Sequence, residues 1–404
     1  MTLSNGLRVI HQSSDSNVVY CGYELNVGTR NEEPGYEGMA HFCEHVSFKG
    51  TKRRKSWHIS NALESVGGDL NAYTNKEDTV YYAAVLKEHT ARAIDLLTDI
   101  VFYSTYPQAE IDKEVEVICD EIESYNDSPA ELIYDEFENL LFANHALGHN
   151  ILGTAERVRN FKTADAQRFT QRYYRPENSI FFLYGDVDFK RVVRLLERAT
   201  SDFAPSKPII EPALNQPLPL NMPDFIEKNH GTHQAHVMVG TRGYDIHDKR
   251  RMSLYLLNNL LGGPGMNARL NLSLRERHGL VYTVESSMVS YCDTGVWAIY
   301  FGCDPKDVGR CLKLVHKELD RVIQKPLSDT QLRAVKKQIK GQIGVACDNR
   351  ESFALDFGKS YLHYGWERDL NSLFRHIDEV TAESMQQVAT ELMQQERLTT
   401  LVID

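Results

Sequence analysis

The chain has 404 residues, of which 42% are hydrophobic and 25% charged, a composition that predicts two or more globular domains with apolar cores. Its formal net charge of -11 argues against nucleic-acid binding, and no apolar run approaches the roughly 18 residues that a membrane-spanning helix needs. The seven cysteines are scattered without a C-x-x-C pair and the N-terminus lacks the features of a signal peptide, so we expect a cytoplasmic protein without a disulfide scaffold.

The first half of the chain mixes strand and helix patterns. Alternating apolar residues predict strands over 7–11, 18–27, 79–86 and 179–185. Helical spacing of apolar residues predicts helices over 38–48, 56–65, 88–102, 108–124, 129–141 and 188–199. This mixture predicts an α+β fold in which helices pack on one face of a largely antiparallel sheet.

The predicted helix 38–48 contains the motif His-Phe-Cys-Glu-His. His41 and His45 are one helical turn apart and therefore share a face, the spacing at which two imidazoles bind one transition metal. Glu44 lies near that face and could accept a proton from a metal-bound water. The order H-x-x-E-H inverts the common zinc-protease motif and predicts a zinc peptidase. Cys43 is interpreted as a small buried residue on the other flank.

A catalytic zinc usually has three protein ligands and a water, so one ligand remains to be found. The predicted helix 108–124 has an apolar stripe and, on the neighbouring face, Glu114 and Glu121. On spacing alone either carboxylate could be the ligand. Such a run of carboxylates is ordinarily a solvated helix face.

Two other groups of histidines compete for a metal. His145 and His149 have helical spacing, but the intervening Gly148 favours a loop. The third group, His230, His233 and His236, is spaced by threes, which in an extended strand sends side chains to opposite faces. Neither group is a favoured site.

The two halves of the chain look similar. Six of the thirteen prolines lie in residues 201–223, which predicts an extended linker between a domain over 1–200 and a second over 224–404. The tetrapeptide Val-Gly-Thr-Arg occurs at 27–30 and again at 239–242, each time after a strand-like run, which favours duplication.

The metal motif is not duplicated. The same offset carries His41 and His45 onto Ser253 and Leu257, neither of which is a metal ligand of this kind. The second domain is therefore predicted to be homologous to the first and to lack a metal site.

Together these features resemble the pitrilysin family of zinc peptidases, which includes insulin-degrading enzyme and the mitochondrial processing peptidase, and the chain resembles a short, two-domain, bacterial-type member. Besides the H-x-x-E-H motif, the resemblance rests on residues 4–9, 67–74, 147–154, the glycine-rich segment 260–266, and the pair Arg275 and Tyr282. Pro264 departs from the family pattern by stiffening the glycine-rich segment.

The resemblance implies a role for each site residue. His41, His45 and Glu121 would hold one Zn²⁺ per chain, and Glu114 would help to orient the site. Glu44 would be the general base of a zinc-dependent endopeptidase. By the same resemblance, Tyr282 and Arg275 would stabilise the oxyanion or anchor the substrate backbone, and the strand containing Asn71, Ala72 and Tyr73 would bind substrate through its exposed edge.

The resemblance also implies substrates and partners. Main-chain recognition predicts peptides or unfolded polypeptide segments as substrates. Related enzymes enclose a chamber with four such domains, so a homodimer is expected, with Arg275 and Tyr282 of one chain serving the zinc of the other. A different protein as partner is less needed, because this sequence contains both the zinc motif and the pair Arg275 and Tyr282. The alternative is a non-catalytic relative that acts as a structural, assembly or peptide-binding subunit. Such relatives commonly lack part of the zinc motif, which is complete here.

Overall fold

The computed structural model describes residues 1–209, 217–218, 222–365 and 369–404, and the chain forms two compact units. Unit 1 consists of three segments, Met1–Ser124, His149–Gln216 and Ala346–Glu367. Unit 2 consists of Tyr125–Gly148, Pro217–Val345 and Arg368–Asp404. The predicted linker 201–223 falls partly outside the described residues.

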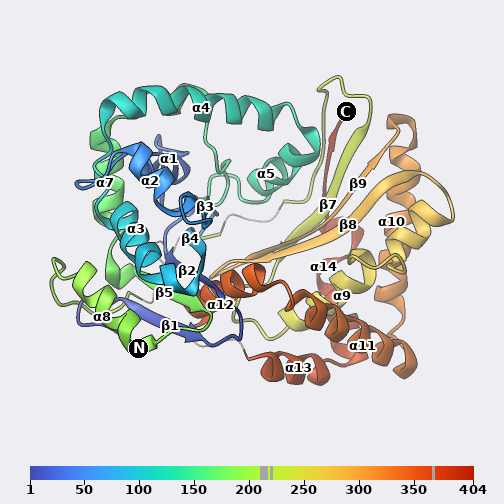
Figure 1. The fold of residues 1–404 in the computed structure, drawn as a ribbon. Helices are drawn as coiled ribbons and strands as arrows, with labels where there is room; N and C mark the ends of the chain where they lie inside the picture. The colour runs from blue at the N-terminus through green and yellow to red at the C-terminus, as the bar shows by residue number, and fades with distance from the viewer. Residues whose placement is uncertain (210–216, 219–221, 366–368) are drawn as a thin grey trace. The chain divides into compact units, whose positions relative to one another are not determined.

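Unit 1 is built on a five-stranded sheet in the order β1-β5-β2-β4-β3 (Figure 1). Its strands are β1 (Arg8–Gln12), β2 (Val18–Leu25), β3 (Asp69–Thr74), β4 (Thr79–Leu86) and β5 (Ser179–Tyr184). β1 pairs with β5 in parallel, and the other neighbours are antiparallel. β2 is the central strand, which explains its nearly continuous apolar sequence, whereas β3 forms an edge.

Helices cover unit 1 on the face that carries its main core, where α3 packs on β2 and β4. The helices of this unit are α1 (Met39–Ser47), α2 (Ser56–Glu64), α3 (Thr90–Phe102), α4 (Gln108–Asn126), α6 (Ala155–Val158), α7 (Thr163–Tyr173), α8 (Phe189–Ala199) and α12 (Arg350–Tyr364). Short 3₁₀ turns lie at Thr29–Asn31, Lys87–His89 and Pro176–Asn178.

Unit 2 has a sheet of the same topology, in the order β6-β10-β7-β9-β8. Its strands are β6 (Phe225–Lys228), β7 (Ala235–Gly243), β8 (Val281–Ser290), β9 (Gly295–Cys303) and β10 (Thr399–Ile403). Its helices are α5 (Pro129–Leu141), α9 (Arg251–Gly262), α10 (Val308–Gln324), α11 (Asp329–Ala346), α13 (Leu370–Glu379) and α14 (Ala382–Leu392), with a π-helical turn at Asn271–Glu276 and 3₁₀ turns at Pro305–Asp307 and Gln395–Arg397. Again the one parallel pair, β6 and β10, lies at the edge.

The predicted fold class is confirmed: two similar α+β units have largely antiparallel sheets with helices on their faces. Each sheet also carries one helix on its second face, taken from the other half of the chain. α12 packs on β2 and β5 of unit 1, and α5 packs on β7 and β10 of unit 2. The predicted contiguous domains, 1–200 and 224–404, differ from the observed units in these two exchanged segments.

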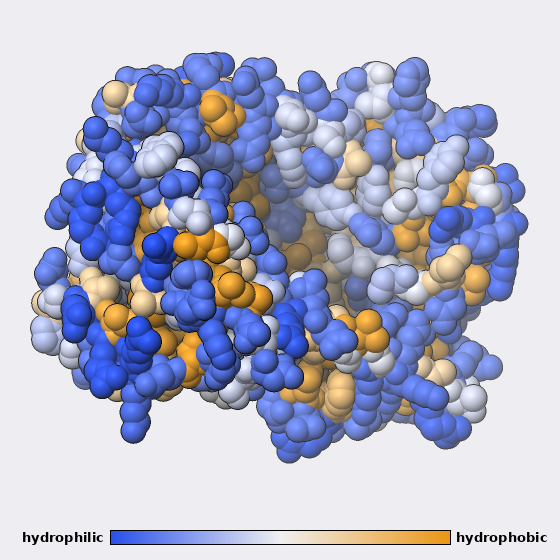
Figure 2. Space-filling model, viewed as in Figure 1, coloured by the Kyte–Doolittle hydropathy of each residue, from blue (hydrophilic) through white to orange (hydrophobic). Residues whose placement is uncertain are grey.

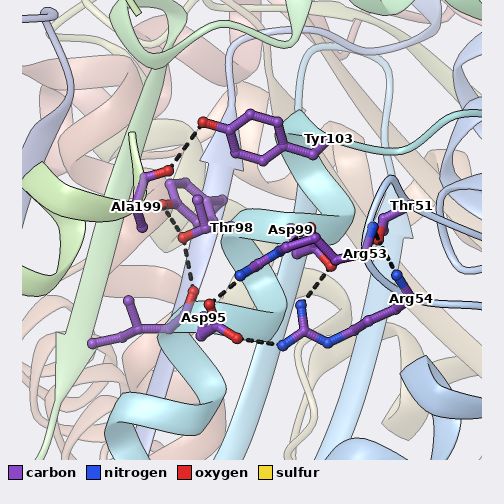
Figure 3. Close-up of polar contacts among 10 residues, drawn as sticks. Thr51, Arg53, Arg54, Asp95, Thr98, Asp99, Tyr103 and Ala199 are labelled. Atoms are coloured by element: carbon purple, nitrogen blue, oxygen red, sulfur yellow. Dashed lines mark hydrogen bonds and ion pairs between the residues drawn. The ribbon is translucent and has the colours of Figure 1, made fainter. Parts of the chain in front are cut away.

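The loop after α1 is held by an ion-pair network (Figure 3). Arg53 Nε lies 3.1 Å from Asp99 Oδ1, and Arg54 Nη1 lies 2.5 Å from Asp99 Oδ2. Both arginines also pair with Asp95 of α3, and Thr51 donates to Asp99. Arg53 and Arg54 thus anchor the loop that follows α1 to α3.

The surface in Figure 2 is mostly hydrophilic, with smaller apolar patches, because most large apolar side chains lie in the cores. None of the helices within the described residues combines the length and apolar composition needed to cross a membrane.

Candidate metal centre

α1 presents the two motif histidines side by side. Phe42, Cys43 and Val46 are fully buried in the core of unit 1, so the helix is fixed with its histidine face turned away from that core. The imidazole rings of His41 and His45 have centroids 4.6 Å apart. The prediction that Cys43 is a buried residue outside the histidine face is confirmed.

α4 brings its carboxylates to the same place. Its predicted apolar stripe is buried, and it consists of Ile111, Val115, Ile118 and Ile122. This packing turns the neighbouring face of α4 towards α1. Glu121 Oε1 lies 3.7 Å from His41 Nε2, and Glu121 Oε2 lies 3.3 Å from His45 Nε2.

The donor set suits zinc. One ligand atom each from His41, His45 and Glu121 lie within 4.8 Å of one another. Two imidazole nitrogens and one carboxylate oxygen are a known ligand set for catalytic zinc, with a fourth position left for water. The side chain of Glu121 is 45% exposed, so water and substrate can reach the group.

The two histidines differ in their electrostatics. Burial, and then the neighbouring His45, lower the pKa of His41 to about 4, which keeps it neutral as a metal ligand must be. Burial also acts to lower the pKa of His45, but hydrogen bonds to Glu114 and Glu121 outweigh it and raise that pKa to about 9. To hold a metal ion here, His45 would have to lose this proton.

Glu114 holds His45 from the side opposite Glu121. Its Oε1 accepts a hydrogen bond from His45 Nδ1 at 3.1 Å, and its Oε2 lies 2.6 Å from Lys49 Nζ. Burial raises the pKa of Glu114, but the hydrogen bonds to His45 and Lys49 lower it below its usual value. A carboxylate on the second ring nitrogen fixes the orientation of a ligating histidine.

Glu44, on α1, contacts Thr74, the last residue of the edge strand β3. Its Oε2 accepts a hydrogen bond from Thr74 at 2.7 Å. Burial raises the pKa of Glu44, although this hydrogen bond opposes the shift. A carboxylate with a raised pKa is well suited to exchange protons near neutral pH.

The remaining predicted residues lie on edge strands or near them. Asn71, Ala72 and Tyr73 are in β3, whose pairing partner on one side is β4. Arg275 and Tyr282 belong to unit 2, Arg275 in the π-helical turn and Tyr282 at a bulge near the start of β8. The side chain of Tyr282 is 79% exposed.

The competing histidines have other surroundings. His145 and His149 lie in a loop, as Gly148 predicted, and His149 Nε2 donates to Glu32 at 2.8 Å. Within the described residues, His230, His233 and His236 do not converge on one point.

Sequence reasoning missed two partners in the site, Thr74 and Lys49. Thr74 ends the segment 67–74 that carries the family resemblance, but its contact with Glu44 was not predicted, because only the paired sheet brings the two residues together. Lys49 lies in the turn after α1 and beyond the predicted helix 38–48, so no local pattern pointed it towards Glu114.

Comparisons with known proteins cover nearly the whole chain. Residues 8–155 match the family model described as insulinase, peptidase family M16, and residues 160–339 match the M16 inactive domain. An uncharacterized zinc protease of Streptomyces coelicolor is 34% identical over 97% of this chain and 86% of that protein. The mitochondrial-processing peptidase subunit beta of Bos taurus is 31% identical over 96% of this chain and 80% of that protein.

Solved structures share the fold. A protease from Helicobacter pylori matches with a TM-score of 0.91 and 23% identity, covering 100% of this chain and 98% of that one. An M16 inactive-domain protein from Pseudomonas fluorescens matches with a TM-score of 0.89 and 17% identity, covering 100% and 97%. With the family models and the relatives above 30% identity, the chain belongs to peptidase family M16, as a pitrilysin-like member.

Proposed function

We propose that this protein is a zinc-dependent endopeptidase that cleaves peptides or unfolded polypeptide segments. The observation that carries the proposal is the convergence of His41, His45 and Glu121, with the carboxylate of Glu44 on the same helix. Relatives that carry the name zinc protease support the same reading.

Each residue has a chemical task in this proposal. A Zn²⁺ held by His41, His45 and Glu121 supplies a Lewis acid and lowers the pKa of a water to about 7. Glu44 accepts the proton of the attacking water and passes it to the leaving amine. Thr74 holds one oxygen of Glu44, which orients the carboxylate for both transfers.

β3 is the proposed substrate-binding strand. It is at the edge of its sheet, so the backbone groups of Asn71, Ala72 and Tyr73 on that side can pair with an extended peptide. Because Thr74 of the same strand donates to Glu44, a peptide added to β3 runs towards the proposed base. Recognition through backbone groups gives broad sequence tolerance.

Arg275 and Tyr282 are proposed to act on the zinc site of a second copy of this chain. The exposed Tyr282 is available to a partner, and the bulge beside it is a feature that re-aims side chains. In a homodimer each chain would then supply the zinc ligands of one site. To the other site it would supply Arg275 and Tyr282, which stabilise the oxyanion or anchor the substrate backbone.

The proposal is tested by digesting a mixed peptide pool and reading the products by mass spectrometry. We expect cleavage that is lost with a chelator and restored with Zn²⁺. Glu44→Gln should lower kcat by about 10²- to 10⁴-fold while zinc remains bound. Glu64→Gln, which changes an exposed glutamate at the end of α2, is the matched control and should retain activity.

Two outcomes would contradict the proposal. Full activity of zinc-loaded Glu44→Gln would remove the assigned base. A wild-type protein that binds zinc and peptide without cleavage would instead be the non-catalytic, peptide-binding subunit that is the alternative.

A further inference from the structure

The N-terminal end of the metal-binding helix is held by a buried carboxylate. Glu32, in the loop between β2 and α1, has a fully buried side chain. Its Oε2 accepts from the backbone N–H of Gly38 at 2.9 Å, and its Oε1 accepts from that of Ala40 at 2.7 Å. The first N–H groups of a helix have no acceptor within the helix, and a negative charge there is favourable.

α1 needs this outside acceptor because its own cap offers none. Gly38 occupies the N-cap position with φ of 97°, in the left-handed region, and has no side chain to accept a hydrogen bond. A Cβ at Gly38 would lie 2.8 Å from the carbonyl oxygen of Leu152, so the helix start is packed tightly against the loop that contains His149.

His149 fixes Glu32 in turn. Its Nε2 donates to Glu32 Oε2 at 2.8 Å, and its own carbonyl oxygen accepts from Lys76 Nζ. His149 is also the residue at which the chain returns to unit 1 after segment Tyr125–Gly148 of unit 2. The helix that carries the candidate ligands is thus tied, through Glu32, to the residue at which the chain re-enters unit 1.

The two candidate histidine ligands are therefore oriented in different ways. His45 is held by Glu114 through its second ring nitrogen. The Nδ1 atom of His41 is buried and has no hydrogen-bond partner among the described residues. Without a hydrogen bond at Nδ1, the His41 ring takes its direction from the backbone of α1 and from packing. Ala40, the residue before His41, is one of the two residues whose backbone N–H groups Glu32 holds.

We propose that Glu32 and His149 are positioning residues that set His41 for metal binding by fixing the start of α1, an inference that rests on the proposed function of the site. Neither side chain is expected to touch metal or substrate. Their removal should change metal binding through the placement of His41.

The test uses Co²⁺ in place of zinc, because its visible absorption reports ligand number and geometry. In Glu32→Ala and His149→Ala we expect the affinity for Co²⁺ to fall by about tenfold or more, with a changed spectrum. In zinc-loaded enzyme we expect kcat to fall more than KM rises. Glu32→Gln should have an intermediate affinity for Co²⁺. Its remaining side-chain oxygen still accepts one hydrogen bond, whereas its NH₂ group faces a backbone N–H that it cannot accept.

Matched controls separate positioning from general damage. Glu33→Ala removes the adjacent surface carboxylate, which pairs with Arg172, and His89→Ala removes a histidine from another His–Glu pair of unit 1. Both should keep the wild-type spectrum and affinity. Thermal unfolding of the metal-free variants checks whether each variant is folded before Co²⁺ is added.

The inference is overturned if folded Glu32→Ala and His149→Ala bind Co²⁺ with wild-type affinity and spectrum. It is also overturned if they lose metal-free stability while the remaining folded fraction binds Co²⁺ normally, since that describes a purely structural role. A wild-type protein that binds Co²⁺ at this site but cleaves no peptide would contradict the proposed function alone.

Discussion

At the scale of single residues, the candidate metal centre is asymmetric. His45 lies between two carboxylates, Glu121 on the side of the ligand atoms and Glu114 on the other, and Lys49 offsets the charge of Glu114. Glu121 lies 3.7 Å from Nε2 of His41, and the Nδ1 atom of His41 has no hydrogen-bond partner among the described residues. We therefore expect a hydrogen bond to set the orientation of the His45 ring for metal binding, and packing to set the orientation of the His41 ring.

Glu114→Gln tests the role of that hydrogen bond. We expect the affinity for zinc, measured by competition with a chelator, to fall by about 10- to 100-fold, because the amide orients His45 less well and no longer stabilises its positive partial charge. Glu110→Gln, one turn earlier on α4 and paired with Lys113 at the surface, should bind zinc like wild type. Equal affinities for the two variants would show that Glu114 does not support the ligand.

A second residue-scale feature lies away from the site, in the middle of β2. Glu24 is fully buried, and neither of its carboxylate oxygens has a hydrogen-bond partner among the described residues. Burial, and then Asp78, raise the pKa of Glu24 well above its usual value, although Lys359 opposes them. The carboxyl group is thus protonated in the folded protein at pH values where the unfolded chain has ionised it.

This shift predicts how stability depends on pH. Because the folded state binds the extra proton, the free energy of unfolding falls as pH rises above the unfolded pKa of about 4.3, with a limiting slope of about 1.4 kcal/mol per pH unit. Glu24→Gln should remove this contribution, so that denaturant unfolding measured from about pH 5 to about pH 7 declines less steeply than in wild type. Glu88→Gln, an exposed control, should keep the wild-type slope, and an unchanged slope in Glu24→Gln would contradict the assignment.

At the scale of elements, α1 is held at both ends by neighbours distant in sequence. Its start is fixed by Glu32, and the loop after its end is fixed to α3 by the ion pairs of Arg53 and Arg54 (Figure 3). The side chain of Asp99 at the centre of that network is completely buried, whereas that of Asp95 is 44% exposed.

Burial predicts unequal effects of losing these two aspartates. Asp99→Ala removes the buried partner of two arginines and should lower the free energy of unfolding by about 3 kcal/mol. Asp95→Ala removes an exposed partner and should lower it by less than about 1 kcal/mol. Chemical denaturation of both variants measures the difference, and a larger loss for Asp95→Ala would mean that the exposed pairs stabilise the loop.

The sequence predicted most elements of the first half of the chain because their apolar periodicities are strong. The predicted helix 129–141 coincides with α5, and 188–199 differs from α8 by one residue. The motif spacing likewise predicted the histidine pair. Choosing Glu121 over Glu114 required the family resemblance, because the two carboxylates lie two turns apart on one helix face. Contacts such as Thr74 with Glu44 depend on pairing between distant segments, which no local pattern encodes.

At the scale of the whole molecule, the two sheets have identical strand orders, which supports the duplication inferred from the tetrapeptide. Exchange of α5 and α12 was not predictable, because an amphipathic helix does not specify which of two similar sheets it will cover. Each exchanged helix packs against its sheet in a separate hydrophobic cluster. Phe357 of α12 packs with Ile180 and Phe182. Phe137 of α5 packs with Met238 and Leu401.

If the proposed homodimer shares its active sites between chains, two inactive variants should restore activity when they are mixed. Glu44→Gln and Tyr282→Phe should each be nearly inactive alone, but mixed dimers contain one site with both native residues. Random exchange of equal amounts then restores about a quarter of wild-type activity. Peptide cleavage after mixing measures this recovery. Absence of recovery, in dimers shown to have exchanged by mass spectrometry, would place each site within one chain.

The proposed function depends on the binding of one catalytic metal ion by His41, His45 and Glu121. Crystals grown with zinc and measured at the zinc absorption edge test it most directly. We predict a single strong anomalous peak in unit 1, about 2 Å from the Nε2 atoms of both histidines and from a carboxylate oxygen of Glu121. A peak elsewhere, or a zinc ion at the histidines with Glu121 turned away, would contradict this assignment of the ligands.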